Sequence, residues 1–100
     1  MTLVWIDRTQ AKTFRFSHEK MERQVLAGDD QLFAKVGELL TDARRILITG
    51  PGETRVHFLN WLRTHMPSVA NEVLGCEVCD QSSDAEIAAL ALKYLRRLAS

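Results

Sequence analysis

The first third of the chain alternates short runs of strand-forming residues with polar turns. An apolar run at Leu3–Asp7 leads into the polar segment Asp7–Gln10, and aromatic and polar residues then alternate over Lys12–Ser17. A period of two is typical of a half-buried strand, so these runs predict a hairpin. A weaker third strand is predicted over Met21–Leu26, before Gly28-Asp29-Asp30 breaks the pattern and offers a helix N-cap.

The rest of the chain alternates helical patterns with short strands. Apolar residues at helical spacing predict a helix from Asp30 to about Asp42, and the run Arg45–Thr49 predicts a buried strand. A second helix is predicted between the Gly50-Pro51-Gly52 turn and Pro67, where it ends or a further short turn begins. A strand is predicted at Val73–Cys79, in which Gly75 indicates a bulge or a close backbone approach.

A last helix is predicted after Ser83 or Asp84, either of which can cap it. Arg96 and Arg97 lie in its last turn, where positive charge interacts favourably with the helix dipole. The apolar stripes of the three helices comprise Leu32, Phe33, Val36, Leu39 and Leu40; Val56, Phe58, Leu59, Trp61 and Leu62; and Ile87, Leu90, Ala91, Tyr94, Leu95 and Leu98.

This order of elements predicts the fold class. Alternation of strand and helix in the later part favours parallel strands with right-handed connections, whereas the early hairpins are antiparallel. We therefore expect an α/β fold with three layers, in which helices cover the faces of a five-stranded mixed sheet ordered about 3-2-1-4-5. The 100 residues fit a single domain over residues 1–100.

Composition and charge narrow the function classes. Apolar residues make up 46% and charged residues 26%, which is ordinary for a globular protein. Thirteen basic and thirteen acidic residues leave a net charge of zero, which argues against a protein that coats nucleic acid but allows a local RNA contact. The opening Met1–Asp7 is not a secretory signal and no apolar run is long enough to span a bilayer, so we expect a cytoplasmic protein without membrane contact.

The segment Ile48–Arg55 runs from a strand through a glycine turn into a helix. Backbone N–H groups at a helix start can hold an anion, and Arg55 can add a charge-assisted contact, so Gly50, Gly52, Thr54 and Arg55 are candidate anion-binding residues. The segment matches neither a Walker loop nor a dinucleotide fingerprint, and Glu53 would repel a phosphate. The alternative interpretation is a tight structural turn.

Two other groups of residues invite a chemical interpretation. Cys76 and Cys79 have a C-x-x-C spacing but lie in a strand, where they point to opposite faces, so two small buried apolar residues are the preferred interpretation. Asp7, Asp80 and Asp84 could together hold Mg²⁺ in a nuclease, or could serve as turn and cap residues. We expect no metal and no small-molecule cofactor.

Phe58 and Trp61 widen the apolar arc of the second helix beyond what one sheet face covers. A wide stripe is usually core, but an exposed one would be a surface for a partner protein or a second copy of the chain.

Three stretches together resemble a known family. Val4–Phe14, with its strand, Asp and polar turn, resembles the opening of the central domain of archaeal and eukaryotic peptide-chain release factors and pelota. Arg45–Leu59 is similar to that domain's strand, Gly-Pro-Gly and helix segment, and Val78-Cys79-Asp80 with Ser83-Asp84 resembles its closing strand and last helix start. Compact bacterial single-domain relatives of this kind are known as translational machinery proteins.

The resemblance implies a fold akin to ribosomal proteins L18 and S11 and to ribonuclease H. It also implies a role on the ribosome, but the Gly-Gly-Gln tripeptide that release factors use is missing from this sequence. We therefore expect a non-catalytic accessory protein that contacts the ribosome or tRNA through the Gly50-Pro51-Gly52 turn and Arg55, together with Arg8 and Lys12. The alternatives are a protein-interaction module or homodimer that uses Phe58 and Trp61, and, ranked last, a metal-dependent nuclease of ribonuclease-H-like fold.

Overall fold

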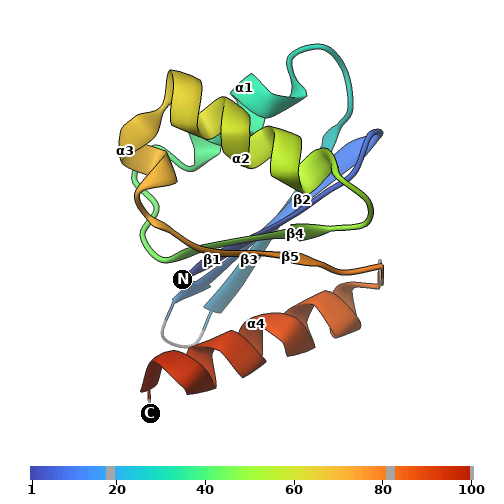
Figure 1. Cartoon of the computed structure of the whole chain (residues 1–100). Coiled ribbons are helices and arrows are strands. Elements are labelled where there is room, and N and C mark those ends of the chain that lie inside the picture. The colour runs from blue at the N-terminus through green and yellow to red at the C-terminus, as the bar shows by residue number, and fades with distance from the viewer. Residues whose placement is uncertain (18–19, 81–82, 100) are drawn as a thin grey trace.

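A five-stranded mixed sheet in the order β3-β2-β1-β4-β5 runs through the middle of the structure, as predicted (Figure 1). The computed structural model describes residues 1–17, 20–80 and 83–99. The elements are β1 (Thr2–Ile6), β2 (Gln10–Ser17), β3 (Lys20–Ala27), α1 (Leu32–Leu39), β4 (Ile46–Gly50), α2 (Thr54–His65), α3 (Pro67–Ala70), β5 (Val73–Val78) and α4 (Asp84–Ala99).

The sheet changes from antiparallel to parallel pairing at β1. β1 pairs antiparallel with β2 and parallel with β4, and β4 pairs parallel with β5. The register of the β4–β5 pairing shifts by one residue: Ile46 lies opposite Val73, and the next residue, Leu47, lies opposite Gly75. The register shift is the bulge expected at Gly75. The close neighbours of Gly75 are side chains rather than backbone, since a Cβ atom there would lie 3.1 Å from the Tyr94 hydroxyl.

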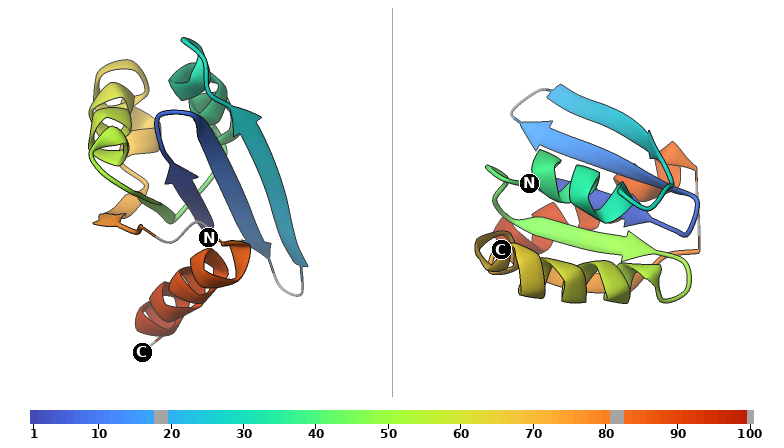
Figure 2. Two further views of the ribbon diagram at one scale, coloured as in Figure 1. Left: turned by 90° about the vertical axis from the view of Figure 1, so that its right-hand side faces the viewer. Right: turned by 90° about the horizontal axis from the view of Figure 1, so that it is seen from above.

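Helices cover both faces of the sheet and make the three predicted layers (Figures 1 and 2). α1, α2 and α3 lie on one face and α4 lies on the other. Alternate residues of β1 serve the two cores: Val4 and Ile6 pack with α1 and α2, whereas Leu3 and Trp5 pack with α4. All five residues of β1 are therefore buried.

The first helix is shorter than its apolar pattern predicts. It was expected from Asp30, but α1 begins at Leu32 after a turn that Asp29 stabilises. The Asp29 carboxylate accepts the Gln31 amide at 2.7 Å and lies 2.7 Å from Lys35 Nζ. The Asp29 side chain forms an Asx turn, which satisfies backbone groups that a longer helix would otherwise bond. The helix therefore begins after this turn.

The last helix starts with a reciprocal cap and then packs through its apolar stripe. The Glu86 amide donates to Ser83 Oγ at 3.3 Å, and Ser83 Oγ donates to Glu86 Oε1 at 2.9 Å, so Ser83 is the cap. Ile87 and Ala91 are fully buried against the sheet. Leu98, expected in the same stripe, lies outside the residues whose side chains are described.

Tyr94 provides a test of how α4 packs on β5. Burial, and after it a hydrogen bond and charge from Glu77, raise the pKa of Tyr94 to about 12. The neutral phenol is therefore favoured in the folded state, and its contribution to stability is present below pH about 10 and lost as pH rises toward the folded value.

We predict that the tyrosinate absorbance of the native protein has its midpoint near pH 12, against about 10 in denaturant. Tyr94 is the only tyrosine, so a stopped-flow pH jump reports it alone. Glu77→Gln should lower the native midpoint, because it removes a neighbouring negative charge. A native midpoint equal to the denatured one would contradict the packing of α4 on β5.

Candidate functional site

A hollow of about 370 Å³ opens at the edge of the sheet where the parallel strands β1 and β4 end. It is lined by the turn after β1 and the turn before α2, namely Asp7, Arg8, Thr9, Pro51, Gly52, Glu53 and Thr54. The chain leaves this edge in two ways, since β1 continues into a hairpin and β4 into a helix. Open α/β sheets bind ligands at such a point, because the diverging connections leave a crevice there.

Gly50 brings the two turns together. Its φ is 146°, and a Cβ atom at this position would lie 2.0 Å from the carbonyl oxygen of Ile6. No side chain can fit between the two strand ends. Gly52 has a φ of 61° and open space around it, so it serves the turn by its backbone conformation alone. The interpretation as a tight strand-to-helix turn is confirmed.

Asp7 builds the turn that presents Arg8. Its Oδ1 accepts hydrogen bonds from the Thr9 amide at 2.8 Å, the Thr9 hydroxyl at 3.0 Å and the Gln10 amide at 2.8 Å. These contacts make an Asx turn, which is the structural role that the sequence allowed for Asp7. Arg8 is exposed at the tip and has no hydrogen bond or ion pair with any residue that the structure describes.

The start of α2 leaves backbone donors beside Arg8. The amide groups of residues 52–55 donate to no other backbone group of the described chain, as is usual for a helix N-terminus. Glu53, the N-cap residue, makes no capping hydrogen bond with its side chain. The hollow therefore combines amide donors and one guanidinium with the negative charge of Glu53, and an anionic group can bind on the Arg8 side.

Arg55 and Lys12, two of the predicted contact residues, do not line this hollow. The Arg55 guanidinium folds back and Nη1 donates to the carbonyl oxygen of Gly52, so it holds the turn. Lys12 lies on the other face of the sheet, 5.6 Å from the centre of the Trp5 ring and 3.3 Å from Asp84 Oδ1. The contacts that Arg55 and Lys12 make depend on tertiary packing, which the spacing of charged residues along the sequence does not reveal.

The three aspartates proposed for a nuclease have separate partners or none. Asp84 pairs with Lys12 and, at 2.7 Å, with Arg23, while Asp7 belongs to its turn and Asp80 is exposed. Over residues 1–17, 20–80 and 83–99, no group of three His, Cys, Asp or Glu side chains could hold a metal ion. The contacts of Asp7 fit its interpretation as a turn residue, whereas Ser83 rather than Asp84 caps α4. None of these contacts supports the nuclease alternative.

The two cysteines lie on opposite faces of the sheet, as predicted. Cys76 packs against the α2 side and Cys79 against the α4 side, and both are partly buried and outside any disulfide. Burial raises the pKa of the Cys76 thiol, although Arg55 and Arg63 act in the opposite direction. Cys76 is therefore kept in its unreactive protonated form.

Phe58 is part of the core, in agreement with the preferred interpretation of the wide stripe, and it is not available as a contact residue. Its side chain is 0% exposed, because α1 lies beside α2 and contributes Phe33, whose ring centre is 5.3 Å from that of Phe58. Trp61 is half-buried and stacks on His65 with a centroid distance of 4.7 Å. The second helix therefore has two neighbours, the sheet and α1, and its wide apolar arc needs no partner protein.

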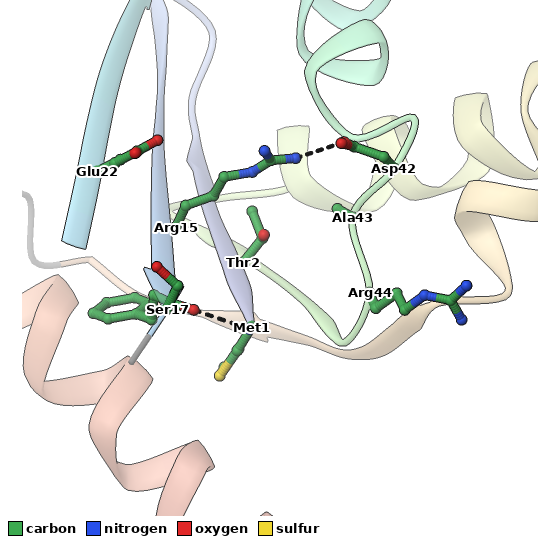
Figure 3. Close-up of a pocket in the computed structure, with 9 residues that line it drawn as sticks. Met1, Thr2, Arg15, Ser17, Glu22, Asp42, Ala43 and Arg44 are labelled. Carbon is green, nitrogen blue, oxygen red and sulfur yellow. Dashed lines mark hydrogen bonds and ion pairs between the residues drawn. The ribbon is translucent and has the colours of Figure 1, made fainter. Parts of the chain in front are cut away.

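A second cavity, which the sequence did not predict, lies at the opposite end of β1 (Figure 3). Arg15, Glu22 and Arg44 are among its lining residues and come from β2, β3 and the loop after α1. The only signal in the sequence is the basic pair Arg44-Arg45 before a strand, which by itself indicates nothing specific.

Comparison with solved structures finds the same fold in two Pelota proteins and in an archaeal translation termination factor. Archaeoglobus fulgidus Pelota matches with a TM-score of 0.70 and 17% identity over 92% of this chain, and Thermoplasma acidophilum Pelota with 0.67 and 18% over 84%. The archaeal translation termination factor aRF1 matches with 0.61 and 14% over 97%. The resemblance to the release factors and pelota is confirmed in the fold, and the match is consistent with their central domain.

The chain spans only about a third of each of these proteins: 30% and 29% of the two Pelota chains and 39% of aRF1. No protein-family model matches the sequence, and no curated protein matches it. In the described part of the chain, no helix has the length and apolar character to cross a membrane.

Gly50→Ala should unfold the protein far more readily than Gly52→Ala. Alanine at position 50 would place Cβ against the Ile6 carbonyl, so we expect a loss of about 3 kcal/mol or more. At position 52 only the left-handed conformation is penalised, by about 1–2 kcal/mol. Urea denaturation of both variants measures the difference, and equal losses would contradict the contact between the strand ends.

Asp84→Asn should lower the free energy of unfolding by about 1 kcal/mol, because it removes both partly exposed ion pairs. Asp80→Asn is the matched control, since Asp80 is exposed and no measurable change is expected. Thermal and urea denaturation report both variants. If the two substitutions cost the same, the ion pairs with Lys12 and Arg23 are not what Asp84 contributes.

Proposed function

We propose that this chain is a translation-associated domain that contacts structured RNA, of the ribosome or of tRNA, through Arg8 and the start of α2. The shared fold supports an association with translation, because one of the proteins with this fold is a translation termination factor. The proposed surface is the hollow at the carboxyl ends of β1 and β4.

The observation that carries the proposal is the partner-free Arg8 beside the exposed amide groups of residues 52–54. Phosphate oxygens accept hydrogen bonds from both kinds of donor, and such contacts position a protein on nucleic acid without reading its sequence. Because the net charge of the chain is zero, the contact is local, and its affinity falls with salt in proportion to the number of phosphates contacted.

The exposed side of α2 extends this surface. The helix carries Arg55, His57, Arg63 and His65 and no acidic residue. His57, Asn60, Arg63 and Thr64 are exposed, and Arg63 Nη1 donates to Asn60 Oδ1 at 3.3 Å. A helix with basic and hydroxyl groups on its exposed side offers further phosphate contacts.

We propose binding rather than catalysis at this surface. Asp7, the carboxylate nearest to Arg8 in the chain, is occupied by three hydrogen bonds of its own turn. The chain also has no Gly-Gly-Gln tripeptide, so the resemblance to release factors does not extend to peptide release.

The expected result is co-sedimentation of the tagged chain with ribosomal particles at low salt and its loss at moderate salt. Arg8→Glu should abolish most of this co-sedimentation. Arg8→Ala should reduce the slope of log K for ribosome binding against log salt concentration by about the share of one phosphate contact. Arg96→Glu makes the same change of charge on the exposed side of α4 and should have no effect.

Two results would count against the proposal. A chain that stays at the top of a sucrose gradient at every salt concentration has no stable contact with the ribosome. Loss of binding in Arg96→Glu but not in Arg8→Glu would transfer the contact to the α4 face.

A further inference from the structure

The cavity at the amino-terminal edge of the sheet has the size of a small-molecule site (Figure 3). Its volume is about 410 Å³, within the range of ligand pockets, and smaller depressions of about 260 and 180 Å³ adjoin it through shared residues. The nine lining residues are Met1, Thr2, Arg15, Phe16, Ser17, Glu22, Asp42, Ala43 and Arg44. The cavity is separate from the hollow beside Arg8, because the two lie at opposite ends of β1.

Arg15 enters this cavity with a fixed orientation. Its Nη2 lies 2.7 Å from Asp42 Oδ1 and donates to the Leu39 carbonyl oxygen at 3.2 Å. The hydrogen bond from Arg15 lowers the pKa of Asp42, so this carboxylate remains charged and keeps the guanidinium in place. Nε and Nη1 have no partner among the described residues, which leaves two directed donors for an oxyanion.

Arg44 lines the cavity, and Arg45 follows it in the same loop. In Figure 3 the Arg44 guanidinium extends away from Arg15, so this exposed side chain has to turn toward the cavity to contact a ligand there. The side chains of Arg44 and Arg45 are both exposed, and neither makes an ion pair or a hydrogen bond within the described chain. Arg45 has a φ of 56°, and its carbonyl oxygen accepts the Thr2 amide at 3.1 Å, which starts the pairing of β1 with β4. Glycine or asparagine would adopt this conformation with less strain, so the backbone alone does not account for an arginine here.

We propose that this cavity binds the phosphate group of a ligand of about mononucleotide size, with Arg15 and Arg44 as the residues that contact the phosphate. A guanidinium held by a carboxylate loses little conformational freedom on binding, and its planar fork matches phosphate oxygens. The same chemistry recognises a free nucleotide or the phosphate of an RNA strand. The proposal does not depend on the ribosome contact at Arg8.

Glu22 opposes this binding and provides a sharp test of it. It lies directly across the β2–β3 pairing from Arg15 and lines the same cavity, but no ion pair joins the two side chains. Asp42 and Glu22 balance the formal charge of the two arginines, so affinity depends on the direction of the donors rather than on net charge. Glu22→Gln removes the repulsion and is expected to strengthen phosphate binding.

The experiment is an NMR titration of the full chain with 5′-AMP, inorganic phosphate and adenosine at millimolar concentrations. We expect AMP and phosphate, but not adenosine, to shift the amide signals of Thr2, Arg15 and residues 42–45. Arg44→Ala should weaken AMP binding about tenfold, the loss of one charge-assisted contact, and Glu22→Gln should tighten it. Arg96→Ala, which removes an exposed arginine on α4 away from both sites, should leave AMP binding unchanged.

The other outcomes are equally clear. Equal shifts with adenosine, no shift with any probe, or unchanged AMP binding in Arg44→Ala would each overturn the proposal. A 5′-phosphorylated RNA oligonucleotide that shifts the same signals when AMP does not would retain the phosphate contact and assign it to RNA. Ribosome co-sedimentation that Arg8→Glu abolishes and Arg44→Ala does not would keep the two proposals separate.

Discussion

β1 is buried on both faces and paired along both edges, and the positions of the other elements follow from this double burial. Leu3 and Trp5 can be covered only by α4, and Val4 and Ile6 only by α1 and α2. Each fully buried aliphatic side chain contributes about 1.5–3 kcal/mol, whereas a partly exposed ion pair contributes about 1 kcal/mol or less. The apolar contacts of β1 therefore outweigh the surface ion pairs, and the polar residues at its two ends are free to serve binding.

The two ends of β1 have different chemistry for the same topological reason. At the carboxyl end, the hairpin to β2 and the turn to α2 diverge, and the close approach of Gly50 to Ile6 keeps their residues together. At the amino end, the loop after α1 passes beside β2 and brings Asp42 to Arg15. With a balanced overall charge, neither end can attract an anion at long range, so any binding depends on donors that are already oriented.

Residue patterns predicted the candidate site well where the signal was local. Gly50, Gly52 and Asp7 could be interpreted as turn residues because each acts on backbone only a few positions away or across one strand pairing. Lys12 and Arg55 were predicted to contact RNA beside the glycine turn, but neither lines the hollow there. A long charged side chain can reach whichever partner the packing provides. The stripe around Phe58 left both a core and a contact surface open, because the width of an apolar stripe does not tell how many neighbours cover it.

The sequence by itself determined the strands, the three longer helices, the order of the sheet and the pair Ser83-Asp84 at which α4 begins. Hydrophobic period, turn chemistry and the preference for right-handed crossovers all act over short stretches of chain. Only the tertiary structure decided which side chains meet across long separations, such as Lys12 with Asp84 and Arg15 with Asp42. Such contacts depend on the face that each helix covers and on the register of each strand, and no local pattern encodes a distance between elements.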